Sequence, residues 1–131
     1  MKKLRLLVVD DSPMIRKMVE GFLRHASTPI EIFEASNGKD ALALAQSQHL
    51  DLILCDINMP GMDGLEFLRT IRADDGTRNI PVVIISAEGR ALRVKEAVEA
   101  GAQGFLRKPF TAQEMRDQIV RVLGQISIDA P

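Results

Sequence analysis

The sequence predicts an α/β protein with a flavodoxin-like (βα)5 fold, built on a doubly wound parallel sheet. Short apolar runs bounded by polar turns alternate with segments of helical periodicity along the 131 residues, as is typical of a parallel sheet covered by helices. A chain of this length supplies one hydrophobic core. We therefore expect a single domain over residues 1–131, with its packed core at about 4–126 and a short C-terminal tail.

The strand order follows from how deeply each apolar run should be buried. The runs 6–9, 52–55 and 82–85 are continuous, so these strands should be covered on both faces and lie at the centre of the sheet. The run 30–34 is interrupted by charge and 104–106 is very short, so both suit the edges. The order 2-1-3-4-5 with right-handed crossovers fits, and it places a ligand site beyond the carboxyl ends of the first and third strands.

Apolar periodicity and capping residues predict five helices. The first begins after Ser12 as N-cap with Pro13 at the first helical position, and the last begins after Thr111, with Glu114 completing a capping box. The fourth should stop near Gly101, and a weaker second helix spans about 38–48. The predicted apolar stripes are Ile15, Met18, Val19, Phe22 and Leu23 in the first helix; Leu65, Leu68 and Ile71 in the third; Ala91, Val94, Ala97 and Val98 in the fourth; and Met115, Ile119, Val122, Leu123 and Ile126 in the fifth.

Composition excludes several classes of partner. Seventeen Lys and Arg against eighteen Asp and Glu leave a net charge of -1, and the absence of Trp and Tyr leaves little for base stacking, so we expect no nucleic-acid partner. No apolar run approaches the roughly 18 residues of a membrane span, and Arg5 interrupts the only segment that resembles a signal peptide, so we expect a cytoplasmic protein without membrane insertion. The single cysteine, Cys55, lies in an apolar run and should be a buried, inert thiol.

Three carboxylates follow the strands that flank the predicted ligand site. Asp10 and Asp11 come directly after the first strand, and Asp56 comes after the third. One aspartate in such a place is commonly a helix cap or a solvated loop residue. Three at the only predicted crevice favour a functional site.

The carboxylate cluster favours a hard divalent cation. Like charges a few ångströms apart repel, and Mg²⁺ joins such a group by using one or two carboxylates, waters and phosphate oxygens. Zinc would need histidine or cysteine ligands, but His25 and His49 lie on a helix end and in a loop, and Cys55 lies in the core. We expect Mg²⁺ and no zinc.

Two further residues should face the same edge of the sheet. Ser86 ends the fourth strand and Lys108 follows the fifth, so that a hydroxyl and an ammonium lie opposite the acids. Each has an ordinary alternative, a helix cap for Ser86 and a solvated lysine or a salt bridge to Asp56 for Lys108. Together they favour an anion site. Three aspartates and one lysine sum to a charge of -2, which Mg²⁺ brings to zero, so a phosphoryl group should approach only with metal bound.

Four segments of the chain resemble, in order, the four motif blocks of response-regulator receiver domains. They are Val8–Ser12, Asp56–Gly64, Ile85–Ala87 and Lys108–Phe110. The resemblance covers almost the whole chain and is greatest to single-domain chemotaxis regulators. It implies a signalling phosphoacceptor of a two-component system, which assists its own phosphorylation and dephosphorylation, rather than an enzyme in the ordinary sense.

The resemblance assigns roles to the acidic residues. Asp56 would accept a phosphoryl group from phosphohistidine on a sensor histidine kinase, or from a phosphotransfer protein. Asp11, Asp56 and the backbone carbonyl of Asn58 would bind Mg²⁺ directly, and Asp10 would help through water. The family also implies a cis bond between Lys108 and the proline that follows it, a form that X-Pro bonds take at low cost.

The resemblance also implies a switch and a hydrolysis path. Lys108 would pair with the phosphoryl oxygens, and Ser86 would donate its hydroxyl to one of them. Ser86 and Phe105 would then change the face made by the fourth helix, fifth strand and fifth helix, where a downstream target protein binds. Asn58 and Glu88 would border the path of the hydrolytic water. Ser86 stands where Thr is commoner in the family, and Phe105 stands where chemotaxis regulators have Tyr, so the resemblance gives weaker support to a flagellar type of target. Simple core packing is the alternative role of Phe105.

Four other readings compete with this one. A flavin carrier on the same fold would need a hydroxyl- and glycine-rich phosphate loop, and here Asp10 and Asp11 would repel the phosphate. A phosphatase of the haloacid dehalogenase type wants a second aspartate where this chain has Asn58. A pseudo-receiver that is never phosphorylated would serve as an interaction scaffold, against which the complete acidic and basic set argues. A receiver excised from a longer regulator would look identical to a free-standing one.

Overall fold

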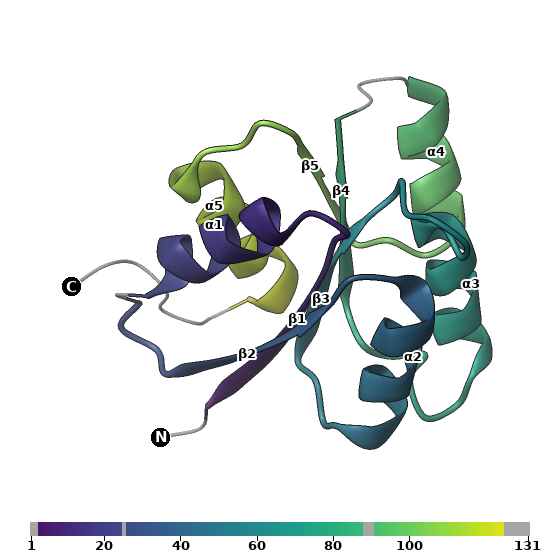
Figure 1. Cartoon of the computed structure of the whole chain (residues 1–131), viewed down its shortest axis with the longest axis horizontal. Helices are drawn as coiled ribbons and strands as arrows, with labels where there is room; N and C mark the ends of the chain where they lie inside the picture. Colours follow the sequence, from purple (N-terminus) through teal and green to yellow (C-terminus); the bar gives the residue numbers. More distant parts are fainter. Residues whose placement is uncertain (1–2, 25, 88–90, 125–131) are drawn as a thin grey trace.

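Five parallel strands and five helices alternate along residues 3–24, 26–87 and 91–124, the part of the chain that the computed structural model describes (Figure 1). In chain order they are β1 Leu4–Val9, α1 Pro13–Leu23, β2 Ile30–Ala35, α2 Gly38–Ser47, β3 Leu52–Asp56, α3 Gly64–Ala73, β4 Val82–Ser86, α4 Ala91–Glu99, β5 Gly104–Arg107 and α5 Ala112–Leu123. None of these helices is long and apolar enough to cross a membrane, within the described residues.

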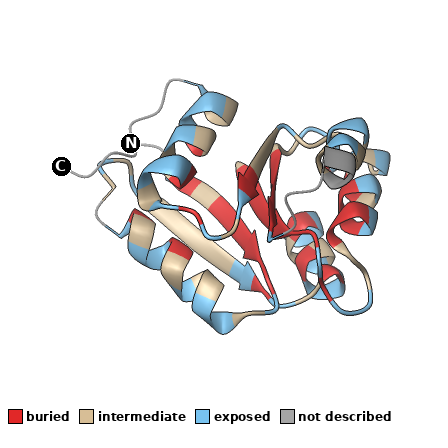
Figure 2. Ribbon diagram, turned by 90° about the horizontal axis from the view of Figure 1, so that it is seen from above, coloured by how far each residue is buried: buried red, intermediate tan, exposed pale blue. Residues whose placement is uncertain are grey.

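The sheet has the predicted strand order, β2-β1-β3-β4-β5, and every neighbouring pair is parallel. All residues of β3 and β4 are buried, whereas β2 and β5 at the edges are largely half-buried. The red central strands of Figure 2 show the same gradient. Because continuous apolar runs can be covered on both faces, the prediction of which strands are central is confirmed.

Helices cover both faces of the sheet. The helices α1 and α5 lie on one face, and α2, α3 and α4 lie on the other (Figure 1). Successive residues of a strand point to opposite faces, so Leu6 and Val8 pack with α1 and α5 while Leu7 and Val9 pack with the other three helices. Phe67 is fully buried in this second layer. The sheet is therefore fixed from both sides, and its carboxyl edge is left for the loops.

The predicted helix caps are present. Ser12 Oγ accepts a hydrogen bond from the Ile15 amide at 3.4 Å. The Thr111 hydroxyl and the Glu114 carboxylate each accept from the other residue's amide, at 3.1 and 3.0 Å, which is the predicted capping box. The chain turns after α4 at Gly101, whose φ of 106° lies in the region that favours glycine.

The prediction for α4 is wrong at one residue, and several predicted features lie outside the described residues. Val98 was expected in the buried stripe but is 62% exposed, because burying Ala97 turns the next side chain about 100° away from the core. The fourth strand ends at Ser86, as predicted. His25, Glu88, the side chain of Ala91 and residues 125–131, which include Ile126 and the tail, lie outside the described part of the chain.

Candidate functional site

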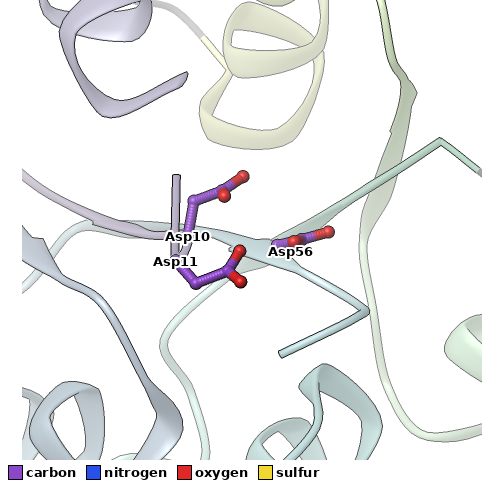
Figure 3. A group of neighbouring side chains, drawn as sticks. All are labelled: Asp10, Asp11 and Asp56. Carbon is purple, nitrogen blue, oxygen red and sulfur yellow. The ribbon is translucent and has the colours of Figure 1, made fainter. Parts of the chain in front are cut away.

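The three predicted carboxylates meet at the carboxyl edge of the sheet (Figure 3). Asp10 and Asp11 follow β1, and Asp56 is the last residue of the neighbouring strand β3. Each offers a ligand oxygen, and these oxygens lie within 4.8 Å of one another. Asp10 is fully buried, Asp56 is 4% exposed and Asp11 is exposed. The site therefore has a buried floor and one carboxylate open to solvent.

Asp10 is held in place from several sides. Its Oδ1 accepts a hydrogen bond from the Ser12 amide at 2.9 Å, and its backbone amide donates to the Ala35 carbonyl at 3.1 Å. Its backbone carbonyl accepts from the Arg16 guanidinium at 2.6 Å, and Arg16 also pairs with Glu34 at 3.1 Å. The position of Asp10 is thus fixed before any ligand binds.

Arg16 is a site-supporting residue that sequence reasoning missed. It lies off the apolar stripe of α1, so periodicity gives it no weight. The signal that was present is its place in the first turn, because helical side chains lean toward the N-terminus and can reach the loop that enters the helix. A long donor there predicts a hydrogen bond to that loop.

Lys108 bridges the two buried carboxylates. Its Nζ lies 2.8 Å from Asp10 Oδ2 and 3.4 Å from Asp56 Oδ2, and its backbone amide donates to the Ser86 carbonyl at 2.8 Å. The sequence left the salt bridge to Asp56 open as an alternative, but it did not predict the shorter contact to Asp10. The Lys108–Pro109 bond is cis, as the family resemblance implied. Lys108 therefore contacts two of the three carboxylates in the acidic cluster.

The pKa values of Asp56 and Lys108 reflect this arrangement. Burial raises the pKa of Asp56, and the charge of Asp10 raises it further, while Lys108 and the Asn58 amide, 3.4 Å from Oδ1, partly offset both. Burial lowers the pKa of Lys108, but its hydrogen bond to Asp10 and the charge of Asp56 outweigh that effect and raise it overall. The negative charge of the cluster is thus only partly compensated by the protein.

The donor set fits a hard divalent cation. All three side chains offer oxygen, one of them is exposed, and the excess negative charge is what such an ion would neutralise. The prediction that Cys55 is buried is confirmed, and burial raises the pKa of its thiol well above the usual value. His49 lies in the loop before β3 and faces Asp51 at 3.6 Å, away from the cluster.

Ser86 and Phe105 lie on one face of the sheet but at different depths. Ser86 is fully buried at the end of β4, at the same edge as Asp56. Phe105 pairs with Ile84 in the ladder, two positions before the pair of Ser86 and Arg107. Since alternate strand residues share a face, Ile84, Ser86 and Phe105 face the layer of α3 and α4. Phe105 is half-buried there, while Asn58 is exposed in the loop after Asp56.

Gly64 brings the start of α3 against the backbone of the site. A Cβ at this position would lie 2.4 Å from the Asp56 carbonyl oxygen and 2.6 Å from Ile57 Cα. The Gly64 amide donates to the Ile57 carbonyl at 2.9 Å. A glycine is required here because any side chain would push the helix away from the strand that carries Asp56.

Asp56→Asn should stabilise the metal-free protein at neutral pH, by on the order of 1 kcal/mol, because it removes a buried negative charge that is repelled by Asp10. The pKa of Asp56 is raised in the folded state, so the folded protein holds this proton more tightly than the unfolded chain does. The stabilisation that this proton gives to the folded state is therefore complete at low pH and is lost as the pH rises through the raised pKa of Asp56. Urea unfolding in EDTA should show a higher free energy of unfolding for Asp56→Asn than for the native protein at neutral pH, and this difference should disappear as the pH falls. A difference independent of pH would show that the charge of Asp56 is not the cause.

Comparison with known proteins agrees with the geometry. Residues 6–120 match the model of the response regulator receiver domain. The chain is 34% identical over 124 residues to the chemotaxis protein CheY of Pseudomonas aeruginosa, covering 95% of this chain and 99% of that protein.

Solved structures agree as well. The structure of the chemotaxis response regulator CheY4 of Vibrio cholerae matches with a TM-score of 0.84 and 35% identity, over 93% of this chain and all of that one. The receiver domain of a Pseudomonas aeruginosa sensor histidine kinase, with a magnesium ion coordinated in its active-site cleft, matches with a TM-score of 0.84 and 27% identity, over 95% of this chain and all of that one. The chain therefore belongs to the response-regulator receiver family, whose CheY-like members it resembles in sequence and in fold.

Proposed function

We propose that this protein is the phosphoacceptor of a two-component system, taking a phosphoryl group on Asp56 in a Mg²⁺-dependent reaction. The donor is a sensor histidine kinase or a phosphotransfer protein, and the pathway is a cytoplasmic one of the chemotaxis type. The observation that carries the proposal is the place of Lys108, 2.8 Å from Asp10 and 3.4 Å from Asp56 beside an exposed Asp11. This arrangement combines a nucleophile, a metal site and a partner for an anion.

The transfer step uses a carboxylate oxygen of Asp56. This oxygen attacks the phosphorus of phosphohistidine, a P–O bond forms, the P–N bond breaks, and the imidazole leaves with the electron pair of that bond. Catalysis of phosphoryl transfer is mainly positioning and charge stabilisation. Asp56 suits this role because it is nearly buried on a rigid strand yet borders the exposed Asp11.

The residues that would hold Mg²⁺ are Asp11, Asp56 and the backbone carbonyl of Asn58, with Asp10 contributing through water. When bound, the ion would neutralise excess negative charge and orient the phosphoryl oxygens. Asp10 already uses Oδ1 for the Ser12 amide and Oδ2 for Lys108, which supports an indirect rather than a direct role for it.

Lys108 and Ser86 are the proposed ligands of the phosphoryl oxygens. The side chain of Lys108 is 19% exposed and its ammonium lies beside the nucleophile, so it can pair with an incoming oxygen without leaving the site. The hydroxyl of Ser86 comes from the next strand at the same edge. Charge-assisted hydrogen bonds of this kind are about twice as strong as neutral ones.

The test is incubation with acetyl phosphate and Mg²⁺, followed by intact mass spectrometry. We expect the addition of one phosphoryl group that is removed by base, as an acyl phosphate is, and none when EDTA is present. Equal uptake in EDTA would contradict the metal site, and no uptake under any condition would favour an interaction scaffold that is never phosphorylated.

The lifetime of the acyl phosphate should depend on Asn58 and Glu88. Asn58 is exposed in the loop after Asp56, and its backbone amide donates to Asp56 Oδ1 at 3.4 Å. We propose that its side chain borders the path of an attacking water. Replacing both residues with arginine should slow or speed decay severalfold while loading still occurs, measured by mass after excess acetyl phosphate is removed. Glu66→Arg, on the exposed face of α3, is the matched control. An unchanged decay rate would show that water arrives by another route.

The proposed output surface is the face of α4, β5 and α5. Its strand β5 pairs with β4, which ends at Ser86, and Lys108 directly follows β5. Val98 on α4 and Val120 on α5 expose apolar side chains. A downstream protein that prefers the phosphorylated form would bind there. The similarity to CheY proteins supports a target of the chemotaxis type.

A further inference from the structure

Arg72 joins three segments at the end of the sheet opposite the carboxylates. It lies in the last turn of α3 and is half-buried. Its guanidinium reaches the loop that precedes β4 and the turn that precedes β5. Those are the amino ends of the two strands whose carboxyl ends carry Ser86 and Lys108.

One side of the guanidinium is fixed to a firmly held loop. NH1 donates to the Ile80 carbonyl at 2.6 Å and to the Arg78 carbonyl at 3.1 Å. The loop itself is held by the buried Thr77, whose hydroxyl donates to the Ile71 carbonyl at 2.8 Å, and by the Arg78 amide, which donates to the Asp74 carbonyl at 2.8 Å. Arg72 is thus anchored on α3 and on a loop that is itself held by hydrogen bonds.

The other side of the guanidinium holds the turn between α4 and β5. Nε and NH2 donate to the Gly101 carbonyl at 3.1 and 2.9 Å, and NH2 also donates to Gln103 Oε1 at 2.7 Å. The same Gln103 oxygen accepts from the Val82 amide at 2.9 Å. A planar fork with fixed donors suits this pattern, which a lysine ammonium cannot reproduce.

The turn approaches Arg72 closely. A Cβ on Gly101 would lie 2.8 Å from Arg72 Nε, and the φ of Gly101 is 106°. A side chain at position 101 would require a strained backbone conformation. It would also clash with the guanidinium of Arg72, which is held in place by its other hydrogen bonds. The close approach is therefore built into both residues.

Elsewhere α4 is weakly attached. Among its described side chains, those of residues 94–99, only Ala97 is buried, and Val98 is 62% exposed. Lys95 and Glu99 form an exposed pair at 4.0 Å on the surface of the helix itself. The C-terminal end of α4, by contrast, leads directly into the turn to which Arg72 is hydrogen-bonded.

We propose that Arg72 is a positioning residue of the output face, a clamp that fixes the C-terminal end of α4 and the entry of β5 on the loop before β4. It makes that end the pivot about which α4 moves when Asp56 is phosphorylated. The clamp rests on the contacts above, and the movement rests on the proposed function.

The clamp is tested by amide hydrogen exchange of the unphosphorylated protein. The amides of Gly101, Ala102 and Gln103 are hydrogen-bonded, to the carbonyls of Val98, Ala97 and Val82, and so report opening of the turn. In Arg72→Gln and Arg72→Lys they should exchange at least about ten-fold faster, because neither side chain reproduces the hydrogen bonds of the planar guanidinium. Amides of β1 and β3, which report global unfolding, should change much less.

The control is Arg69→Gln, an exposed arginine on the same helix. Exchange in the turn that is no faster in the Arg72 variants than in this control would overturn the clamp. So would acceleration that is equal in the turn and in β1 and β3, because Arg72 would then contribute only to global stability.

The pivot is tested on protein loaded with acetyl phosphate and Mg²⁺. In the native chain, amide shifts should be large over residues 94–97 and small over 101–103, and in Arg72→Gln they should spread into 101–103 at unchanged loading. Shifts as large at 101–103 as at 94–97 in the native chain would overturn the pivot. If Asp56 takes up no phosphoryl group, the proposed function and the pivot both fail, and the exchange data still decide the clamp.

Discussion

Lys108→Met should lose most of the phosphoryl uptake and destabilise the metal-free protein. The change leaves Asp10, which is fully buried, without the ammonium that lies 2.8 Å from its Oδ2. Removing one partner of a buried pair costs about 3 kcal/mol or more. Loss of a positioned donor to the transferring group should slow uptake by roughly 10²- to 10³-fold.

The measurements are urea unfolding in EDTA and the rate of mass gain with acetyl phosphate and Mg²⁺. Lys108→Arg is the matched control, since it keeps the charge and should retain most of the stability. Arg107→Met, an exposed neighbour on β5, should change neither quantity. Native uptake rates in Lys108→Met would show that the ammonium does not contact the phosphoryl group.

Ser86→Ala should accept a phosphoryl group on Asp56 but fail to change the output face. In the proposed switch, the hydroxyl moves toward the phosphoryl oxygens and the ring of Phe105 fills the space that it leaves. Ser86 is fully buried and shares a face with Phe105, so a movement of one changes the packing around the other. Phe105→Ala should weaken target binding with loading nearly intact.

The magnitudes allow this switch but leave it incomplete. Moving a two-state equilibrium from 1:99 to 99:1 needs about 5.5 kcal/mol. New contacts from Ser86 and Lys108 to a phosphoryl group would contribute roughly 1.5 to 3 kcal/mol each. A target that prefers the phosphorylated form should therefore complete the change.

Amide shifts in α4 and α5 on phosphorylation provide the measurement. Ser86→Thr keeps the hydroxyl and should keep the shifts, whereas Ser86→Ala should lose most of them at equal loading. Shifts of native size in Ser86→Ala would mean that the coupling does not pass through this pair, and Phe105 would then be core packing alone.

Much of the fold could be predicted because continuous apolar runs in the sequence indicate which strands are buried. The runs at β3 and β4 identify central strands, and the charges within β2 identify an edge. Topology then brings Asp10, Asp11 and Asp56 together, since the carboxyl ends of neighbouring parallel strands share an edge. The prediction for Val98 was wrong because helical periodicity does not give the width of the buried face, and in α4 the small Ala97 is buried while the neighbouring Val98 is exposed.

Finer features of the site could not be predicted. Whether Lys108 lies nearer Asp10 or Asp56 depends on loop positions at the scale of about 1 Å. The contacts of Arg16 and Arg72 go mainly to backbone carbonyls, which every residue carries. The types of the partner residues therefore do not predict these contacts. Long polar side chains in the first or last turn of a helix are the signal that remains.

The central claim, that Asp56 is the phosphoacceptor of a Mg²⁺-dependent site, is tested most directly by comparing Asp56→Asn with Asp75→Asn. Asp75 is an exposed loop carboxylate, so its variant controls for nonspecific modification. After incubation with acetyl phosphate and Mg²⁺, intact mass should show one base-labile phosphoryl group on the native protein and on Asp75→Asn, and none on Asp56→Asn. Undiminished, metal-dependent uptake by Asp56→Asn would contradict the claim.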